Sequence, residues 1–355
     1  MFQSFDLPNH SAHGPDRLAR LRDAMRAEGV QGFVVPRADA HQGESVAPRD
    51  ERLAWLTGFT GSAGLCVALL DRAAVFVDGR YTLQARAQVA ADAFEIVPIG
   101  ETSPEAWLAD ALGEGAVLGL DPMLHTAAGV AKLDAAAVRA GAATRLLAEN
   151  LVDRIWEDQP PPPTGAVHAH PDALAGEPAA EKRRRVAAEI AGEGAAAAVL
   201  TLPDSIAWLL NVRGADVPRN PAPLAFALLR ADGRATLFAA PDKFDAAVRA
   251  HLGDAVEIAP PDAFSAALDA LAGETVMVDR DSAPAFVGRR LEAAGAVPLW
   301  RRDPCILPKA VKNATEIEGE RAGDPGDAGG MGRFMRWLSE AAPSGALDEI
   351  AVVKA

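Results

Sequence analysis

Two stretches of the sequence resemble one another, RLAWLTGFTGS at 52–62 and SIAWLLNVRGA at 205–215. Each places Ala-Trp-Leu in an apolar turn and continues into a loop that contains glycine. The two tryptophans, Trp55 and Trp208, are 153 residues apart. The likeness of the two stretches therefore indicates a duplication within the chain.

The segments around the two stretches repeat as well. Residues 17–36 predict an amphipathic helix followed by a buried strand, and residues 182–203 repeat that plan. Beyond the tryptophans, residues 64–81 and 223–242 each predict two apolar strands joined by a polar hairpin. Two copies imply two α/β domains, each a mixed sheet flanked by helices. Chance similarity between common αβ units is the alternative.

Proline-rich and polar stretches separate the predicted segments. Residues 153–176 include four consecutive prolines, which fit neither a helix nor a central strand, and they predict a linker. A second break follows the strand-like AVPLW, where a polar segment begins. We expect a first domain at 1–152, a second at 177–303 and a third segment at 304–355.

Composition and charge exclude several classes of protein. The 355 residues are 49% hydrophobic and 24% charged, which describes a globular chain. A net charge of −14 repels phosphate backbones and anionic bilayers, so we expect neither nucleic acid nor a membrane as partner, and the basic run at 182–185 is interpreted as a solvated helical face. Cys66 and Cys305 fit no disulfide framework or zinc spacing, and the N-terminus carries no export signal, so we predict a cytoplasmic location.

Isolated residues of catalytic types do not form a recognised motif. Ser62 lacks the glycine of a hydrolase elbow, because Thr60 stands at that position. His168 and His170 have a spacing that zinc accepts, but no third ligand lies nearby in the sequence. Asp279 follows a predicted strand, where capping of the next helix is favoured over binding of a ligand.

Polar residues follow two predicted strands of the first domain. His41, Gln42 and Glu44 lie in the loop that leaves the first buried strand, and loops at the carboxyl ends of strands often line clefts. Asp78 and Arg80 follow a later strand. The guanidinium of Arg80 suits bidentate binding of a carboxylate, although a surface salt bridge is the favoured interpretation on sequence alone.

Read together, five stretches resemble the aminopeptidase P family in its long, three-domain form, and their order and spacing match over residues 17–321. Any one of them is weak evidence, whereas five in the correct order are highly specific. They are DAHQGESVAPRDERLAWLTGFTGSAG (39–64), VFVDGRYTLQA (75–85), ENLVDRIWEDQPPPP (149–163), SIAWLLNVRGADVPRNP (205–221) and DPCILPKAVKNATEIEGERA (303–322).

The resemblance implies a fold and an activity. The family has two creatinase-type N-terminal domains and a pita-bread catalytic domain that releases the N-terminal residue from peptides with proline second. In the full-length family member two divalent metals, commonly manganese, activate the attacking water. Their ligands are two Asp, one His and two Glu.

The third segment is expected to be a truncated start of the pita-bread domain. By resemblance that domain begins near Lys309, and no histidine follows His251. We therefore assign no catalytic residue and no metal ligand in this chain, expect no cofactor in it, and predict that it is inactive alone. The alternative is a catalytically silent binding or dimerisation module of aminopeptidase P type, which forms a homodimer through its first domain.

The resemblance also suggests residues that face the substrate or an interface. Glu44 and Arg80 match first-domain motifs that face the catalytic cleft or the dimer interface. Arg213, Asp216 and Asn220 match a second-domain motif that faces the third domain, although Pro-Arg stands where relatives often carry a histidine.

One long helix of the family is interrupted in this sequence. Six glycines and Pro325 lie between Gly319 and Gly332. An interior glycine costs roughly 1 kcal/mol and proline about 3 kcal/mol, so we predict irregular structure or two short helices there. We also predict that Phe334, Trp337 and Leu338 are poorly buried.

Overall fold

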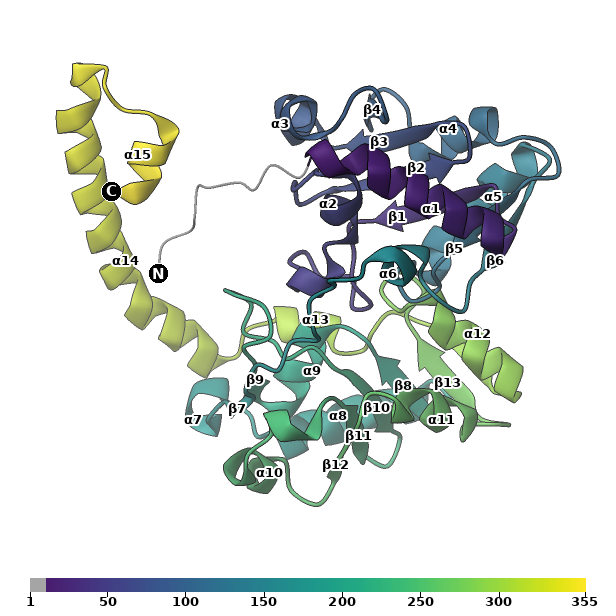
Figure 1. Cartoon of the computed structure of the whole chain (residues 1–355). Coiled ribbons are helices and arrows are strands. Elements are labelled where there is room, and N and C mark those ends of the chain that lie inside the picture. The colour runs from purple at the N-terminus through teal and green to yellow at the C-terminus, as the bar shows by residue number, and fades with distance from the viewer. Residues whose placement is uncertain (1–10) are drawn as a thin grey trace.

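The structure is a computed structural model that describes residues 11–355. The N-terminal stretch in which the sequence shows no export signal lies mostly before these residues. Within the described part of the chain, no helix combines the length and the apolar character needed to cross a bilayer. Two six-stranded sheets, each with its own helices, make up most of the structure (Figure 1).

The first sheet has the strand order β4-β3-β2-β1-β5-β6. Only β2 runs against its neighbours, because it pairs antiparallel with β1 and β3, whereas the other pairs are parallel. The carboxyl ends of the remaining strands therefore lie at one edge. The strands are β1 (Gly32–Pro36), β2 (Gly64–Leu69), β3 (Ala73–Val77), β4 (Glu95–Pro98), β5 (Val117–Leu120) and β6 (Ala143–Leu146).

The second sheet repeats this topology strand for strand, in the order β12-β11-β10-β8-β13-β14. Here β10 is the antiparallel strand. The strands are β8 (Ala197–Leu200), β10 (Phe226–Arg230), β11 (Ala235–Phe238), β12 (Val256–Ala259), β13 (Thr275–Val278) and β14 (Val297–Trp300). The predicted duplication and the predicted α/β class are confirmed.

The tryptophans of the repeated stretches occupy equivalent helices. Trp55 lies in α2 (Arg52–Thr57), the helix after β1, and Trp208 lies in α9 (Pro203–Leu210), the helix after β8. The predicted equivalence of these two residues is therefore confirmed.

Helices cover both faces of each sheet. In β1, Phe33 and Val35 join one buried cluster while Val34 joins the cluster on the opposite face. Such two-sided burial explains the nearly continuous apolar runs of the central strands. The other helices of the first unit are α1 (Gly14–Glu28), α3 (Thr82–Gln88), α4 (Pro104–Ala111), α5 (Ala127–Arg139) and α6 (Leu151–Ile155), and those of the second are α7 (Asp172–Ala175), α8 (Ala179–Gly192), α10 (Ala246–Leu252), α11 (Ala263–Asp269), α12 (Ala285–Ala294) and α13 (Ile306–Ala310).

The proline-rich connection contains no helix or strand between α6 and the two-residue strand β7 (His168–Ala169). Pro162 and Pro163 line a small cavity of about 210 Å³ between the two units. β7 pairs with β9 (Val212–Arg213) in a separate two-stranded sheet. The domain limits given above stay a prediction, because α6 and β7 extend into the predicted linker at either end.

The two units meet through equivalent residues. Thr126 and Pro284, the residues that immediately precede α5 and α12, form an isolated antiparallel bridge with each other. The helices α5 and α12 that follow them also pack together. Equivalent elements thus face one another across the contact.

Backbone hydrogen bonds at this junction are reciprocal. The N–H of Ala128 donates to Arg280 O at 3.0 Å, and the N–H of Phe286 donates to Pro122 O at 3.0 Å. Ala128 and Phe286 hold the same place in α5 and α12, and Arg280 and Pro122 hold the same place after β13 and β5. An interface in which i contacts j and j contacts i is isologous, so the two units are related by an approximate internal two-fold axis.

The predicted break in the C-terminal helix is wrong. α14 (Ala314–Ala341) is one helix of 28 residues with Pro325 inside it, and it extends away from both sheets (Figure 1). Asn313 and Glu316 form a complete capping box at its start. Glycine and proline lower the free energy gained by a helix without forbidding helical backbone angles, which is why propensity is a weak guide here.

The apolar residues of α14 are not buried, as predicted. Phe334, Trp337 and Leu338 are all partly exposed, and Met331 and Met335 are 59% and 55% exposed. After α14 the chain continues through a short turn to α15 (Glu349–Lys354).

Candidate functional site

The loops that follow the parallel strands of both sheets meet at the junction between the two units. The loop after β1 reaches the second sheet through His41, whose Nδ1 lies 3.2 Å from Thr201 O. Thr201 follows β8, the equivalent strand. In α/β folds ligands bind outside the carboxyl ends of strands, so a site is expected at this edge.

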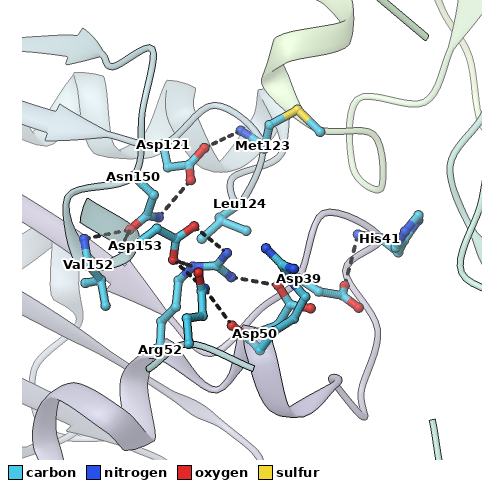
Figure 2. A network of polar contacts seen from close by, with 12 residues as sticks. Asp39, His41, Asp50, Arg52, Asp121, Met123, Leu124, Asn150, Val152 and Asp153 are labelled. Carbon is cyan, nitrogen blue, oxygen red and sulfur yellow. Dashed lines mark hydrogen bonds and ion pairs between the residues drawn. The ribbon is translucent and has the colours of Figure 1, made fainter. Parts of the chain in front are cut away.

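An ion-pair network occupies this edge in the first unit (Figure 2). Arg52 donates from Nε and Nη2 to the two carboxylate oxygens of Asp153, at 2.7 and 2.8 Å, and from Nη1 to Asp50 at 2.8 Å. Burial disfavours the guanidinium charge, but the hydrogen bonds and the attraction of Asp153 and Asp50 outweigh it and raise the pKa of Arg52. The Arg52–Asp153 ion pair is structural, because both carboxylate oxygens of Asp153 already accept hydrogen bonds from Arg52.

A buried amide and a carboxyl lie beside the network. Asn150 donates from Nδ2 to Asp121 Oδ2 at 2.7 Å, and its Oδ1 accepts the N–H of Val152 at 2.8 Å as the cap of α6. Burial raises the pKa of Asp121, and the hydrogen bond from Asn150 opposes that rise. Figure 2 shows Asp121 also accepting the N–H of Met123.

The second unit has the same loop geometry with different charges. Asp279 accepts the N–H groups of Asp281 and Asp303, at 2.9 and 3.0 Å, and Asp303 accepts that of Cys305 at 2.7 Å. Asp303 Oδ2 and Ser205 Oγ are both buried, and neither has a partner in normal hydrogen-bond geometry among the described residues. Burial raises the pKa of Asp303, while the N–H of Cys305 opposes the rise. The predicted capping of the next helix by Asp279 is wrong, because α12 begins after Pro284 without a side-chain cap, and Asp279 instead holds two loop N–H groups.

His41 is enclosed between the units. Its ring packs against that of Phe226 with the centroids 4.6 Å apart and the planes tilted by 38°, and burial lowers the pKa of His41. Because Thr201 O only accepts, Nδ1 carries the proton in the 3.2 Å contact. Asp39 Oδ1 accepts the backbone N–H of His41 and of Gly43, at 2.9 and 3.0 Å. This loop therefore joins the two sheets.

The first-unit residues singled out by sequence lie at the surface. Arg80 donates from Nε to Asp78 Oδ1 at 2.8 Å, and this hydrogen bond is the main cause of its raised pKa. Glu44 is exposed, and its backbone carbonyl accepts from Arg37 at 2.6 Å. A surface salt bridge is thus present at Arg80, and the roles proposed for Glu44 and Arg80 stay predictions.

The second-unit residues divide between a groove and the interior. Arg213 and Asn220 line a groove of about 1060 Å³ between α9, β9 and the first turns of α14. Asp216 does not line it. Its side chain is fully buried, pairs with Lys243 Nζ at 2.5 Å and accepts the N–H groups of Gly165 and Leu224. Asp216 therefore holds the loop that carries the other two.

Sequence reasoning missed the buried lysine of the basic run. Lys182 was interpreted as part of a solvated face, yet it is 2% exposed and donates from Nζ to Trp208 O and Asn211 Oδ1, at 3.1 and 2.8 Å. Its ammonium also lies 4.6 Å from the Trp208 ring centroid. No local pattern signals these contacts, because both partners lie more than twenty residues away in the sequence.

A metal centre needs several donor side chains arranged around one point, and the structure describes residues 11–355. No group of three or more His, Cys, Asp or Glu side chains in this part of the chain is arranged to hold a metal ion. Ser62 Oγ lies 2.6 Å from Tyr81 Oη, and that is the partner found for it.

Comparison with known families identifies both units. Residues 17–155 match the Creatinase/Prolidase N-terminal domain family, and residues 158–316 match a second profile with the same description. The two matches cover the two sheets separately.

Individual relatives match along almost the whole chain. A probable Xaa-Pro aminopeptidase P of Neosartorya fischeri is 36% identical over 336 residues, which is 91% of this chain and 51% of the relative. One from Coccidioides posadasii is 34% identical over 95% of this chain and 53% of its own length. The chain thus spans about half the length of the curated relatives it matches.

A solved structure has the same arrangement. The crystal structure of X-prolyl aminopeptidase from Caenorhabditis elegans, described as a cytosolic enzyme with a di-nuclear active site, superposes with a TM-score of 0.84 and 26% identity over 93% of this chain and 56% of that one. Both units match in one superposition, which supports the junction described above. With a family domain in each half and relatives aligned along 91% of its length, this chain belongs to the Xaa-Pro aminopeptidase P family.

Proposed function

We propose that this chain supplies the two N-terminal domains of an Xaa-Pro aminopeptidase, which acts on peptides with proline second, and that alone it does not hydrolyse them. The observation that carries the proposal is the paired creatinase-type fold, matched over 93% of the chain by an X-prolyl aminopeptidase. We place the protein in the cytoplasm, since Cys66 and Cys305 are free and buried.

The described residues do not fit a dinuclear metal centre. The carboxylates of Asp50 and Asp153 are engaged by Arg52, and no group of three or more His, Cys, Asp or Glu side chains within residues 11–355 is arranged to hold a metal ion. Two divalent ions need several oxygen or nitrogen ligands that are free to bind them. We assign the activated water to metals, manganese by preference, in the full-length family member, and derive no hydrolytic step through metals in this chain.

The proposed contribution of this chain is to position peptides or neighbouring domains. Glu44 and Arg80 present one exposed carboxylate and one exposed guanidinium near the carboxyl edge of the first sheet. Arg213 and Asn220 present polar groups to the groove of the second unit. Asp216 acts on them only as a positioning residue, through its pair with Lys243.

Hydrolysis is tested directly. The purified chain is incubated with Mn²⁺ and the bradykinin fragment Arg-Pro-Pro, and release of the N-terminal residue is followed with and without chelator. The Neosartorya fischeri relative, assayed in parallel, controls for the quality of substrate and metal. We expect no release above the chelated blank. Chelator-sensitive release by this chain would overturn the proposal.

A silent module that forms a homodimer through the first unit is the second candidate. Leu83, close to Arg80 in the sequence, is 81% exposed on α3, and a dimer formed through this surface would cover it. Light scattering after size exclusion should then report a dimer that Leu83→Ser dissociates. Val138→Ser, at a 64% exposed site on α5, is the matched control. A monomer at every concentration would exclude this candidate.

A further inference from the structure

We propose that the groove between α9, β9 and the first turns of α14 binds a peptide carboxylate, with Arg213 as the principal donor. The carboxylate is either a C-terminal group or an acidic side chain, and both have the same recognition chemistry. The inference goes beyond the proposed function, because binding in this groove requires neither metal nor hydrolysis.

Arg213 is a half-buried cation without a direct anionic partner. Its Nη1 donates to Val212 O at 2.9 Å, and among the described residues no carboxylate lies within ion-pair distance of it. Burial is the main cause that lowers its pKa. A guanidinium has five N–H donors in a fixed fork, so most of its donors remain available to a ligand.

A second cation, Lys182, and one histidine lie at this end of the groove. His170 lines the groove, and the buried Lys182 lies below the Trp208 ring. Burial lowers the pKa of His170, and repulsion from Arg213 and Lys182 adds to that effect. Arg213, His170 and Lys182 therefore lie close together, and no anion is in direct contact with Arg213.

Glu316 is the nearest compensating charge. It raises the pKa of Arg213, His170 and Lys182, but it makes an ion pair with none of them. Its Oε2 instead accepts the N–H of Asn313 at 2.9 Å, as part of the capping box of α14. The carboxylate of Glu316 is therefore held by the helix, and a ligand carboxylate can approach Arg213 more closely than Glu316 does.

The remaining groove charges have ion-pair partners, and Glu318 pairs at 3.9 Å with Arg321, which lies outside the groove lining. Lys309 pairs with Asp204, and Lys312 lies 3.6 Å from Glu320. These pairs leave the Arg213 end as the part of the groove where a carboxylate gains most from charge complementarity.

The rest of the groove suits a peptide chain. Leu174 is 60% exposed, the Trp208 ring is half-exposed, and Pro221 and Ala222 continue the apolar wall. Asn220 adds a carboxamide, which can donate to and accept from a peptide backbone. A volume of about 1060 Å³ accommodates several residues.

Calorimetric titration of the whole, metal-free chain tests the proposal with three peptides. The first is Ala-Pro-Leu-Leu with a free C-terminus, the second is the same peptide amidated, and the third is amidated Ala-Pro-Leu-Glu. We expect the first or the third to bind and the amidated neutral peptide to bind at least about tenfold more weakly, because one charge-assisted bidentate contact is lost. The first and third arms identify the source of the carboxylate. Equal affinity for all three, or no binding at millimolar peptide, would overturn the proposal.

Variants assign the donor. Arg213→Gln should weaken binding at least about tenfold, whereas Arg213→Lys keeps the charge without the fork and should give an intermediate affinity. Arg302→Gln, at an exposed arginine outside the groove, is the matched control and should change nothing. Glu316→Gln keeps the capping box while removing the competing charge, and should tighten binding. If Arg213→Gln and Arg213→Lys bind as Arg302→Gln does, the assignment is wrong. Because these titrations contain no metal, their failure leaves the hydrolysis assay unaffected.

Discussion

The two units have one topology and one set of loop contacts, but their buried charges differ. In the first, Arg52 neutralises Asp153, and the amide of Asn150 faces Asp121. In the second, Ser205 and Asp303 stand at the places of Arg52 and Asn150, and no buried cation contacts Asp303 among the described residues. Both units retain an aspartate directly after the equivalent strand, Asp121 after β5 and Asp279 after β13. Each accepts the backbone N–H of the residue two positions later in the sequence. Backbone hydrogen bonding thus maintains the loop, while the charge of its neighbours has changed.

The sharpest test of this comparison removes the buried cation of the first unit. Arg52→Ala leaves Asp153 and Asp50 without their partner and should destabilise the first unit by about 3–5 kcal/mol. Ser205→Ala, the equivalent change in the second unit, should cost less, about 1 kcal/mol, because it removes an uncharged hydroxyl beside Asp303 and breaks no ion pair. Urea unfolding monitored by fluorescence measures both. Similar costs would show that the two loops are not held by different interactions.

Acid should distinguish the two sides of the junction. Burial lowers the pKa of His125 from its ordinary 6.5 to about 4, and the equivalent residue of the second unit is Ala283. A lowered histidine pKa gives stability that is present above pH 6.5 and is lost as the pH falls toward 4, by about 3 kcal/mol in all. His125→Ala should therefore flatten the stability profile between these pH values. An unchanged slope would contradict this assignment, whatever the variant does at neutral pH.

Exchanging the amide and the carboxyl makes a reciprocal pair of variants. Asn150→Asp loses the hydrogen bond to Asp121 and adds a second buried carboxyl, and should cost about 1–3 kcal/mol. Asp303→Asn should stabilise the second unit at pH 7. A raised carboxyl pKa gives stability that is fully present below the ordinary aspartate pKa and lost as the pH rises through the folded-state pKa. The melting temperatures of both variants at pH 7 and pH 4 test these expectations. A lower melting temperature for Asp303→Asn at pH 7 would show that the charge of Asp303 does not destabilise the second unit.

The smallest global effect is expected in α14, which contrasts with the packed helices of both units. No residue of α14 is buried, so Pro325→Ala should raise its helicity without changing the unfolding midpoint of either sheet. Hydrogen exchange should be fast over 314–341 and slow in α1. Slow exchange in α14 would show a packing partner.

Periodicity and repetition predicted the fold, because the central strands are buried on both faces and the helices packed on the sheets each bury one apolar stripe. The continuity of α14 was missed, since counting glycines measures a cost and does not decide a conformation. The burial of Lys182 was missed because a lysine in a basic run has the pattern of a solvated one. The groove was equally inaccessible to sequence, because α9 and α14 are separated by about a hundred residues and only the fold brings them together.

The contact at the approximate two-fold axis, between Thr126 and Pro284, cannot be lost by diluting the protein. In a dimer of separate subunits such a contact would dissociate at low concentration. Here one chain carries both halves, so each meets the other at an effective concentration on the order of millimolar or above, whatever the amount of protein present. The melting temperature of this contact is then independent of protein concentration. Tethering also frees each half to vary alone, because a substitution alters one side of the axis instead of both, as His125 opposite Ala283 illustrates.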